Sequence, residues 1–343
     1  MNFTSDNCYG AAPEMLDALA KTNTGPAASY GDDAISVRLN MLFSEVFEHE
    51  VAVFPVVSGT AANALSLSTL VPPYGAIVCH AQSHIAVDEC GAVEMATHGA
   101  KLISIDGPYG KLTPGAIETA VAPIQKGVVH HAQPSAVSIT QSTEFGTAYR
   151  PEEIAAIGEV THRHGMKLHV DGARFANAVA FLKCAPADIT WRAGVHAMSF
   201  GATKNGALGA EAVIFFDKNA VGDFEYRRKK SGHLLSKMRF VSAQLEAYLD
   251  DGRWLSHAAR ANTLATQLAE GLRGIEDAQI AAPVEANAIF VKLPNSAVSR
   301  LREAGAQFYD WMPSKDGMTL IRLVTSFATP DADVANFISI ARG

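Results

Sequence analysis

The sequence predicts an α/β fold in which helices cover both sides of a mostly parallel sheet, followed by a small α+β domain. Short apolar runs alternate with longer amphipathic runs over the first two thirds of the chain. Most of the short runs are apolar at consecutive positions, which is typical of strands that are buried on both faces. From about residue 225 the pattern changes to long helical segments and then to shorter units.

The elements follow in order along the chain. We expect strands of the large sheet at 50–58, 75–80, 101–105, 136–140, 167–171, 196–200 and 212–216, with helices between them at 60–71, 86–99, 113–125 and 150–165. After the basic run Arg227–Lys230, two long helices are expected at 237–254 and 257–275. The tail alternates strand and helix at 287–294, 298–311, 319–327 and 330–342. These patterns predict a large domain with an N-terminal arm over residues 1–238 and a small domain over 239–343.

Composition limits the class of protein. The chain has 343 residues, of which 48% are hydrophobic and 18% charged, as expected for a large buried core. Its net charge of -7, with no basic stripe, gives no support to a nucleic-acid partner. No apolar run approaches the roughly 20 residues that cross a bilayer, and the N-terminus lacks an apolar signal core. The four cysteines show no CxxC spacing, which favours reduced thiols and a soluble cytoplasmic protein.

An aspartate and a lysine mark the first candidate site. Asp171 ends the apolar run KLHVD, and Lys204 stands among small residues in SFGATKNGALGAE. A lysine amine can form a Schiff base with pyridoxal phosphate, and a carboxylate can keep its pyridinium nitrogen protonated. Taken singly, an aspartate in a turn and a lysine on a surface loop are the more ordinary interpretations.

A candidate phosphate site follows the first strand. Ser58, Gly59 and Thr60 lie at a turn into a helix, where free backbone N–H groups and the positive helix end favour an anion. An ordinary N-cap is the alternative. The turn has neither a Walker lysine nor a GxGxxG pattern, so it favours neither P-loop nor nicotinamide chemistry.

His84 follows the second strand, and its imidazole could stack on a planar cofactor. The alternative is a histidine that is hydrogen-bonded locally at a helix start. Cys79, His80 and Cys90 lie nearby, but their spacing matches no zinc signature, so we expect no metal site.

Two arginines are candidates for binding a carboxylate. Arg174 lies just beyond Asp171, and Arg322 lies within the apolar strand candidate 319–327. A planar guanidinium binds a carboxylate through two hydrogen bonds, and burying it is costly without a partner. For each arginine the alternative is a buried ion pair with an acid of the protein.

Taken together, TSDN, ASYGDDAISVRLN, VSGTAANALSL, AQSHIAVDECGA, LHVDGARFANA and SFGATKNGALGAE resemble the L-threonine aldolase family over essentially the whole chain. The segment RRKKSGHLLSKMRFVSAQLEAYL resembles its low-specificity branch. That resemblance implies a fold type I pyridoxal-phosphate enzyme with an aspartate aminotransferase-like large domain.

The resemblance also implies roles for individual residues. Lys204 would hold the cofactor, Asp171 would pair with its ring nitrogen, and Ala173 and His84 would pack on opposite faces of the ring. Ser58, Gly59 and Thr60 would bind the phosphate. Ser5, Arg174 and Arg322 would bind the substrate carboxylate, and Tyr30 would reach the site across a subunit boundary.

Two stretches depart from the family pattern. Where relatives carry a histidine near the substrate hydroxyl, this chain has TQSTEF, which places Glu144 there. Where relatives carry an arginine after a glycine-rich segment, GHLLSKMR aligns ambiguously, so Lys237 or Arg239 would complete the phosphate site. Glu144, His84 and a bound water remain alternatives for the general base.

We therefore expect a lyase that cleaves L-threonine, L-allo-threonine and related β-hydroxy-α-amino acids to glycine and an aldehyde. A β-eliminating lyase or an aminotransferase on the same scaffold is the alternative enzyme, and a non-catalytic cofactor-binding protein is the alternative outside enzymes. The resemblance also implies a homodimer or a homotetramer.

Overall fold

The computed structural model describes residues 1–312 and 316–343. Its larger sheet has the strand order β1-β7-β6-β5-β4-β2-β3. The strands are β1 (Ala52–Val56), β2 (Gly75–His80), β3 (Lys101–Ile105), β4 (Gln133–Thr140), β5 (Lys167–Gly172), β6 (Ala197–Gly201) and β7 (Glu211–Phe215). Strands β2 to β6 pair in parallel, whereas β7 pairs antiparallel with β1 and with β6. The predicted mostly parallel α/β sheet is confirmed.

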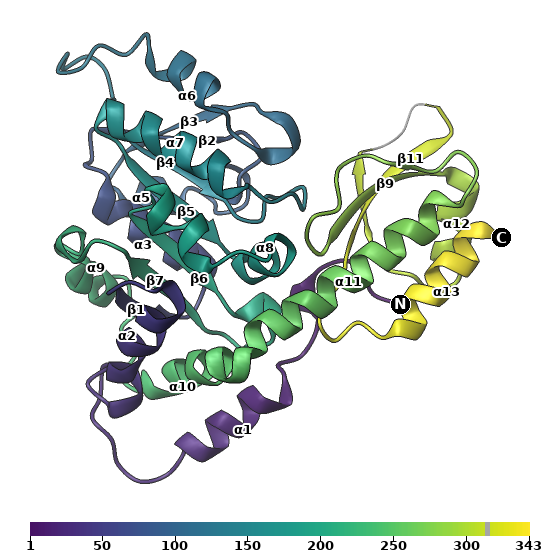
Figure 1. The fold of residues 1–343 in the computed structure, drawn as a ribbon, viewed down its shortest axis with the longest axis horizontal. Helices are drawn as coiled ribbons and strands as arrows, with labels where there is room; N and C mark the ends of the chain where they lie inside the picture. The colour runs from purple at the N-terminus through teal and green to yellow at the C-terminus, as the bar shows by residue number, and fades with distance from the viewer. Residues whose placement is uncertain (313–315) are drawn as a thin grey trace.

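Helices cover both faces of this sheet (Figure 1). Within β2, Val78 belongs to the core that includes α7 (Pro151–His164) and α8 (Phe175–Leu182). Its neighbours Ile77 and Cys79 belong to the opposite core, under α3 (Gly59–Leu70) and α5 (Ala92–Ala96). Because side chains alternate along a strand, an apolar run with no polar position requires cover on both sides.

The predicted helix over 86–99 is wrong in one respect, because the segment forms two short helices, α4 (His84–Val87) and α5. Between them Cys90 and Gly91 have φ values of 51° and 74°. Two successive residues with positive φ cannot continue a right-handed helix. The break places Glu89 at a turn that faces the candidate site.

The remaining helices of the large unit are α1 (Pro13–Thr22), α2 (Ala34–Phe47), α6 (Pro114–Val121), α9 (Phe224–Lys230) and α10 (Arg239–Leu249). The long α11 (Arg253–Arg273) then runs from α10 towards the second sheet (Figure 1). Among the described residues no helix combines the length and the apolar character needed to cross a membrane.

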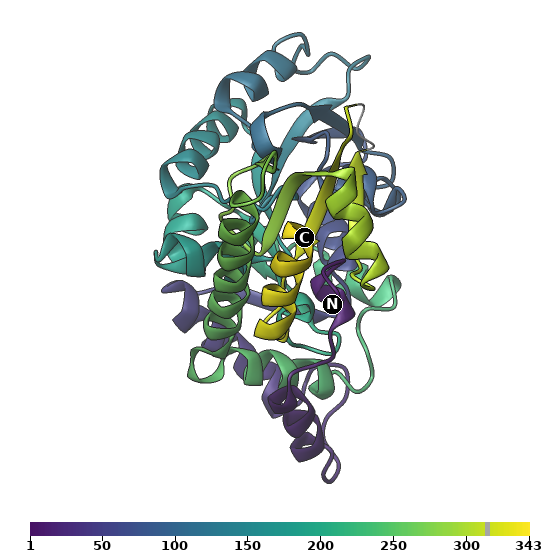
Figure 2. The ribbon, with the colours of Figure 1, turned by 90° about the vertical axis from the view of Figure 1, so that its right-hand side faces the viewer.

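The smaller sheet is antiparallel and lies in the C-terminal part of the chain. Its strand order is β10-β11-β9-β8, formed by β8 (Gln279–Ile280), β9 (Ala288–Pro294), β10 (Tyr309–Met312) and β11 (Met318–Val324). Helices α12 (Asn295–Glu303) and α13 (Asp331–Arg342) complete an α+β unit, which confirms the predicted small C-terminal domain. Figure 2 shows α11 and α13 side by side against these strands.

The N-terminal arm begins in the small unit and crosses to the large one. Phe3 is fully buried in the smaller core, and its ring packs edge-on against Phe337 at 5.1 Å between centroids. The chain then passes through the short 3₁₀ helix Asp6–Cys8 towards α1. This crossing places Ser5 and Asp6 between the two units. The boundary at 238/239 stays a prediction, since α10 packs in the larger core and α11 contributes to both.

Candidate active site

The candidate site lies at the carboxyl ends of the parallel strands, where open α/β sheets bind ligands. Ser58 follows β1, His84 follows β2, Asp171 lies in β5 and Lys204 follows β6. A small cavity brings together Gly59, Asn63, His84, Thr140, Ser142, Glu144, Asp171, Ala173, Arg174 and Lys204. The fold therefore gathers seven of the residues predicted from sequence around one cavity.

Asp171 is fixed by a network of hydrogen bonds. In the sheet it lies between Thr140 on β4 and Ser199 on β6. Its Oδ2 accepts from Asn63 Nδ2 at 2.8 Å, and its Oδ1 accepts from the backbone N–H of Ala173 at 3.0 Å. Asn63 comes from α3, so the helix that begins at the candidate phosphate turn also orients this carboxylate.

Lys204 lies in the 3₁₀ helix Thr203–Asn205 and is partly buried. Burial lowers the pKa of its ammonium group, and the positive charge of Arg174 lowers it further. Within residues 1–312 and 316–343 its Nζ forms no hydrogen bond or ion pair. Such a lysine is more readily deprotonated than a surface lysine, as a nucleophilic amine requires.

The turn at the start of α3 has the form expected of an anion site. Ser58 is the N-cap, and its side chain accepts from the backbone N–H of Ala61 at 3.3 Å. Apart from its chain neighbours and the backbone of its own helix, no heavy atom lies within 4 Å of the position that a Cβ on Gly59 would occupy. Gly59 and Thr60 are partly buried in the first turn, where N–H groups are free of intrahelical partners.

His84 is held by two acids. Its Nδ1 lies 2.7 Å from Oε1 of Glu89, and its backbone N–H donates to Oε1 of Glu144 at 2.9 Å. The hydrogen bond with Glu89 raises the pKa of the imidazole against the opposing effect of burial. The sequence left open whether His84 stacks on a cofactor or is hydrogen-bonded locally. The structure allows both, because the hydrogen bond with Glu89 uses only one ring nitrogen.

Glu144 has one satisfied oxygen and one unsatisfied oxygen. Its Oε1 also accepts from Thr140 Oγ1 at 2.8 Å, whereas Oε2 is buried without a hydrogen-bond partner among the described residues. Burial raises the pKa of this carboxyl to about 7, and the negative charge of Asp171 adds to the shift. A carboxylate near neutrality with a free oxygen beside the cavity is suited to accept a proton.

The two candidate arginines have different partners. Arg174 donates to both oxygens of Asp6, from Nε at 2.7 Å and from Nη2 at 2.9 Å, so it forms the buried ion pair considered from sequence. Ser5 precedes Asp6, and its Oγ lies 3.4 Å from Oδ1 of that residue. Arg322 has no acidic partner in the described part of the chain; its Nη2 donates to the backbone carbonyl of Thr4 at 3.2 Å, and its Nε is buried and unpaired. Its guanidinium lies over the Tyr309 and Trp311 rings at 5.2 and 5.4 Å.

Three predicted residues lie away from this cavity within one chain. The backbone N–H of Tyr30 donates to Ser236 at 3.1 Å, and the Lys229 ammonium lies 4.2 Å from the centre of its ring. Lys237 is exposed, and Arg239 donates to the backbone carbonyl of Gly25. Tyr30 and the basic segment thus lie together, outside the set of residues that lines the cavity.

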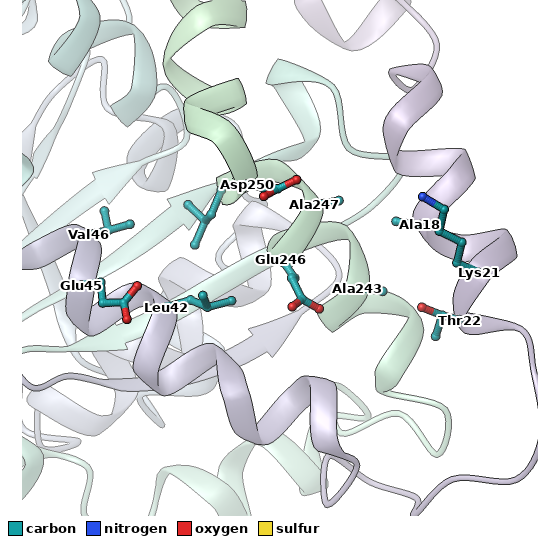
Figure 3. A pocket seen from close by; sticks show the side chains of 11 residues that line it. Ala18, Lys21, Thr22, Leu42, Glu45, Val46, Ala243, Glu246, Ala247 and Asp250 are labelled. Carbon is teal, nitrogen blue, oxygen red and sulfur yellow. The ribbon is translucent and has the colours of Figure 1, made fainter.

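A second hollow of the described surface differs from this cavity. It lies between α1, α2 and α10 and is lined by apolar side chains that include Leu42 and Val46, and by the acids Glu45, Glu246 and Asp250 (Figure 3). None of the residues predicted from sequence lines it. In the described ranges no group of three or more His, Cys, Asp or Glu side chains is placed to hold a metal ion.

Sequence reasoning missed several residues of the site. Asn63, Glu89 and Asp6 each have a buried side chain that is hydrogen-bonded to a predicted residue, and the buried Glu211 accepts from the backbone N–H of Ala202, two residues before Lys204. Both Asn63 and Glu89 lie in segments that carry the family resemblance, VSGTAANALSL and AQSHIAVDECGA. Their roles depend on contacts between distant segments, which spacing alone does not reveal.

The donor set fits pyridoxal phosphate. Ser142 Oγ and Glu144 Oε2 are buried next to the cavity with no hydrogen-bond partner in the described residues. A lysine of lowered pKa, a fixed carboxylate and a helix N-terminus surround the same space. These groups match the aldehyde, ring nitrogen and phosphate of that cofactor.

Known proteins resemble this chain over nearly its whole length. Residues 2–296 match the family described as beta-eliminating lyase. The chain is 42% identical over 332 residues to a low specificity L-threonine aldolase of Pseudomonas sp. (strain NCIMB 10558), covering 97% of this chain and 94% of that protein. A low specificity L-threonine aldolase of Pseudomonas aeruginosa is 42% identical over 310 residues, covering 90% and 89%. The solved threonine aldolase of Leishmania major has a TM-score of 0.93 at 29% identity, covering 99% and 98%.

Proposed function

This chain belongs to the beta-eliminating lyase family and groups with its low-specificity L-threonine aldolases, and we propose that it cleaves L-threonine and L-allo-threonine to glycine and an aldehyde. It is a lyase that depends on pyridoxal phosphate. When bound, the cofactor supplies a conjugated ring that accepts the electron pair of the breaking Cα–Cβ bond. The similarity at 42% identity over 97% of the chain carries this conclusion.

Different residues around the cavity would bind different parts of the cofactor. Lys204 would bond to its aldehyde carbon, a role supported by the lowered pKa of the amine. Asp171 would hold a proton at the ring nitrogen, supported by the two hydrogen bonds that fix its carboxylate. Ser58, Gly59 and Thr60 would bind the phosphate, while Ala173 and His84 would face the ring.

The substrate would be bound by its carboxylate and its hydroxyl group. We assign the carboxylate mainly to Arg322, because its unpaired Nε needs an acceptor, with Ser5 and Arg174 beside it. We assign the hydroxyl proton to Glu144, because burial brings the pKa of this carboxyl to about 7. A fixed carboxylate holds the Cα–Cβ bond in one orientation, so binding selects which bond breaks.

The test is aldehyde release from L-threonine and from L-allo-threonine by the purified protein with added pyridoxal phosphate. Lys204→Ala is the control, and it should lose the activity while keeping the fold by circular dichroism. Release of ammonia and a keto acid would instead identify an eliminating lyase, and a requirement for a second keto acid would identify an aminotransferase. Unchanged properties of Lys204→Ala would favour the non-catalytic alternative.

We also propose that the protein works as a homodimer or a homotetramer in the cytoplasm. Tyr30 and the basic segment that holds Lys237 and Arg239 lie together and outside the cavity, which supports their use across a subunit boundary. The four cysteines are free thiols, in keeping with a reducing compartment. Sedimentation of wild type and of Tyr30→Phe, combined with mixed-variant complementation, tests the shared site.

A further inference from the structure

Glu89 is a buried acid at the edge of the site, and none of the roles above uses it. Its side chain has no exposed surface, and it lies at the turn between α4 and α5. Its Oε1 accepts from Asn63 Nδ2 at 2.8 Å and lies 2.7 Å from Nδ1 of His84. Its other oxygen, Oε2, has no partner among the described residues. A buried carboxyl with this geometry is costly to stability, which suggests that it serves the site.

Asn63 extends the contact to Asp171. The same Nδ2 donates one hydrogen to Glu89 and the other to Oδ2 of Asp171, each at 2.8 Å. The two carboxylates fix the orientation of the amide, because turning it over would place Oδ1 against both; as it stands, Oδ1 accepts from Ser199 Oγ at 2.6 Å. The amide group therefore bridges two carboxylates in one fixed orientation.

We propose that Glu89 is a positioning residue that holds the proton of His84 on Nδ1 and, through Asn63, ties the imidazole to Asp171. The accepting oxygen faces Nδ1, so Nε2 is the nitrogen left for the cavity. The orientation of the imidazole and the orientation of Asp171 are then set by one network. The expected loss of turnover rests on the proposed function, whereas the spectral test of the network requires the bound cofactor but no substrate.

The hydrogen bond with Glu89 determines the direction of the effect on His84. The groups that face His84 are Glu89 from the α4–α5 turn, Asp171 from β5, Lys204 from the 3₁₀ helix and Glu144 from the segment after β4. The hydrogen bond with Glu89 is the largest cause of the raised pKa of His84. Replacing the carboxylate by an amide weakens this bond and removes the smaller effect of the charge, so the pKa of His84 falls and the imidazole titrates at lower pH.

The experiment is a pH titration of the absorbance of the cofactor-loaded protein, run beside kcat and KM for L-threonine. We expect a spectral step that disappears in His84→Asn and moves to lower pH in Glu89→Gln, which keeps the shape of the side chain. We expect kcat of Glu89→Gln to fall by at least about tenfold while KM changes by less than about twofold, since positioning acts on turnover. Glu89→Asp keeps the charge on a shorter side chain, so its spectral step should lie at a pH between those of the wild type and Glu89→Gln.

The matched control is Glu94→Gln, which removes another acid with a buried, unpaired Oε2 five residues further along, on α5 and outside the network. Its spectral step should coincide with that of the wild type. The proposal is overturned if the step of Glu89→Gln also coincides with the wild type, or if the step survives in His84→Asn. Absence of aldehyde release from the wild type would reject the proposed function alone, because the spectral titration needs no substrate.

Discussion

Arg174 and Asp6 form a buried, two-point ion pair that joins the large unit to the N-terminal arm. Asp6 also accepts from Nδ2 of Asn287, which precedes β9, at 3.0 Å. Two of the donors of Arg174 are thus committed to the protein, whereas Nε of Arg322 is unpaired. The pair fixes how the arm crosses the site, and it leaves Arg322 as the stronger candidate for the substrate carboxylate.

Arg322→Lys should therefore weaken substrate binding. A lysine keeps the charge but loses the planar fork that binds both oxygens of a carboxylate. We expect kcat/KM for L-threonine to fall by about tenfold or more, mostly through KM. Arg302→Lys changes an exposed arginine on α12 and is the control. If Arg322→Lys, Arg302→Lys and the wild type have equal KM values, the substrate carboxylate is bound by Arg174 instead.

Asp6→Asn should destabilise the protein. Removing one partner of a buried pair leaves an uncompensated charge, which costs about 3 kcal/mol. Although burial alone would raise it, the charge of Arg174 holds the pKa of Asp6 below its usual value. The ionised Asp6 therefore adds to the free energy of unfolding above its unfolded-state pKa. This contribution is lost as the pH falls through the lower pKa of the folded state. Urea denaturation at pH 7 and at successively lower pH checks this, and wild type and variant should converge in acid.

Much of this fold could be predicted from the sequence, because the strands are short apolar runs and buried strands leave that pattern wherever they occur. The antiparallel direction of β7 could not be predicted, because the residues EAVIF do not indicate which strand they pair with or in which direction. In the site, Lys204 and Asp171 could be predicted because the two together, within the surrounding motifs, fit a cofactor that neither residue indicates alone. Asn63 and Glu89 did not, because their importance depends on meeting Asp171 and His84 across the fold.

Glu144→Gln should remove a pH-dependent step from catalysis. The carboxyl of Glu144 has a pKa of about 7, and only its ionised form accepts a proton. Wild-type kcat/KM should therefore rise with pH through about 7, whereas the variant should lose that rise along with about 100-fold in rate. Steady-state kinetics between pH 5.5 and 9 in a buffer of constant ionic strength is the measurement. A variant with the wild-type profile would assign the proton to another group.

Asp171→Asn should lower turnover more than substrate binding. The amide keeps the size of the side chain but cannot hold a proton at the ring nitrogen as a carboxylate does. We expect kcat to fall by about 100-fold or more with KM within about threefold. Asn63→Ala leaves the carboxylate but removes one of the hydrogen bonds that orient it, so a smaller loss of kcat is expected. If kcat falls further in Asn63→Ala than in Asp171→Asn, the orientation of the Asp171 carboxylate contributes more to turnover than its charge.

Glu211→Gln tests whether the acid at the start of β7 lowers stability as the pH rises from acid to neutral. Glu211 is buried beside the loop of Lys204, where its Oε2 accepts from the backbone N–H of Ala202 at 3.3 Å. Burial raises the pKa of this carboxyl to about 7 from its ordinary 4.5.

A folded-state pKa above the unfolded one means that the native protein binds more protons between these values. The stability that Glu211 contributes is therefore complete below about pH 4.5 and is lost as the pH rises through about 7, by roughly 3 kcal/mol at most. Glutamine does not ionise, so the cofactor-free variant should lose less stability than the wild type between pH 5 and pH 8. Urea denaturation at the two pH values measures the difference, and an equal loss in both proteins would show that Glu211 ionises freely in the folded state.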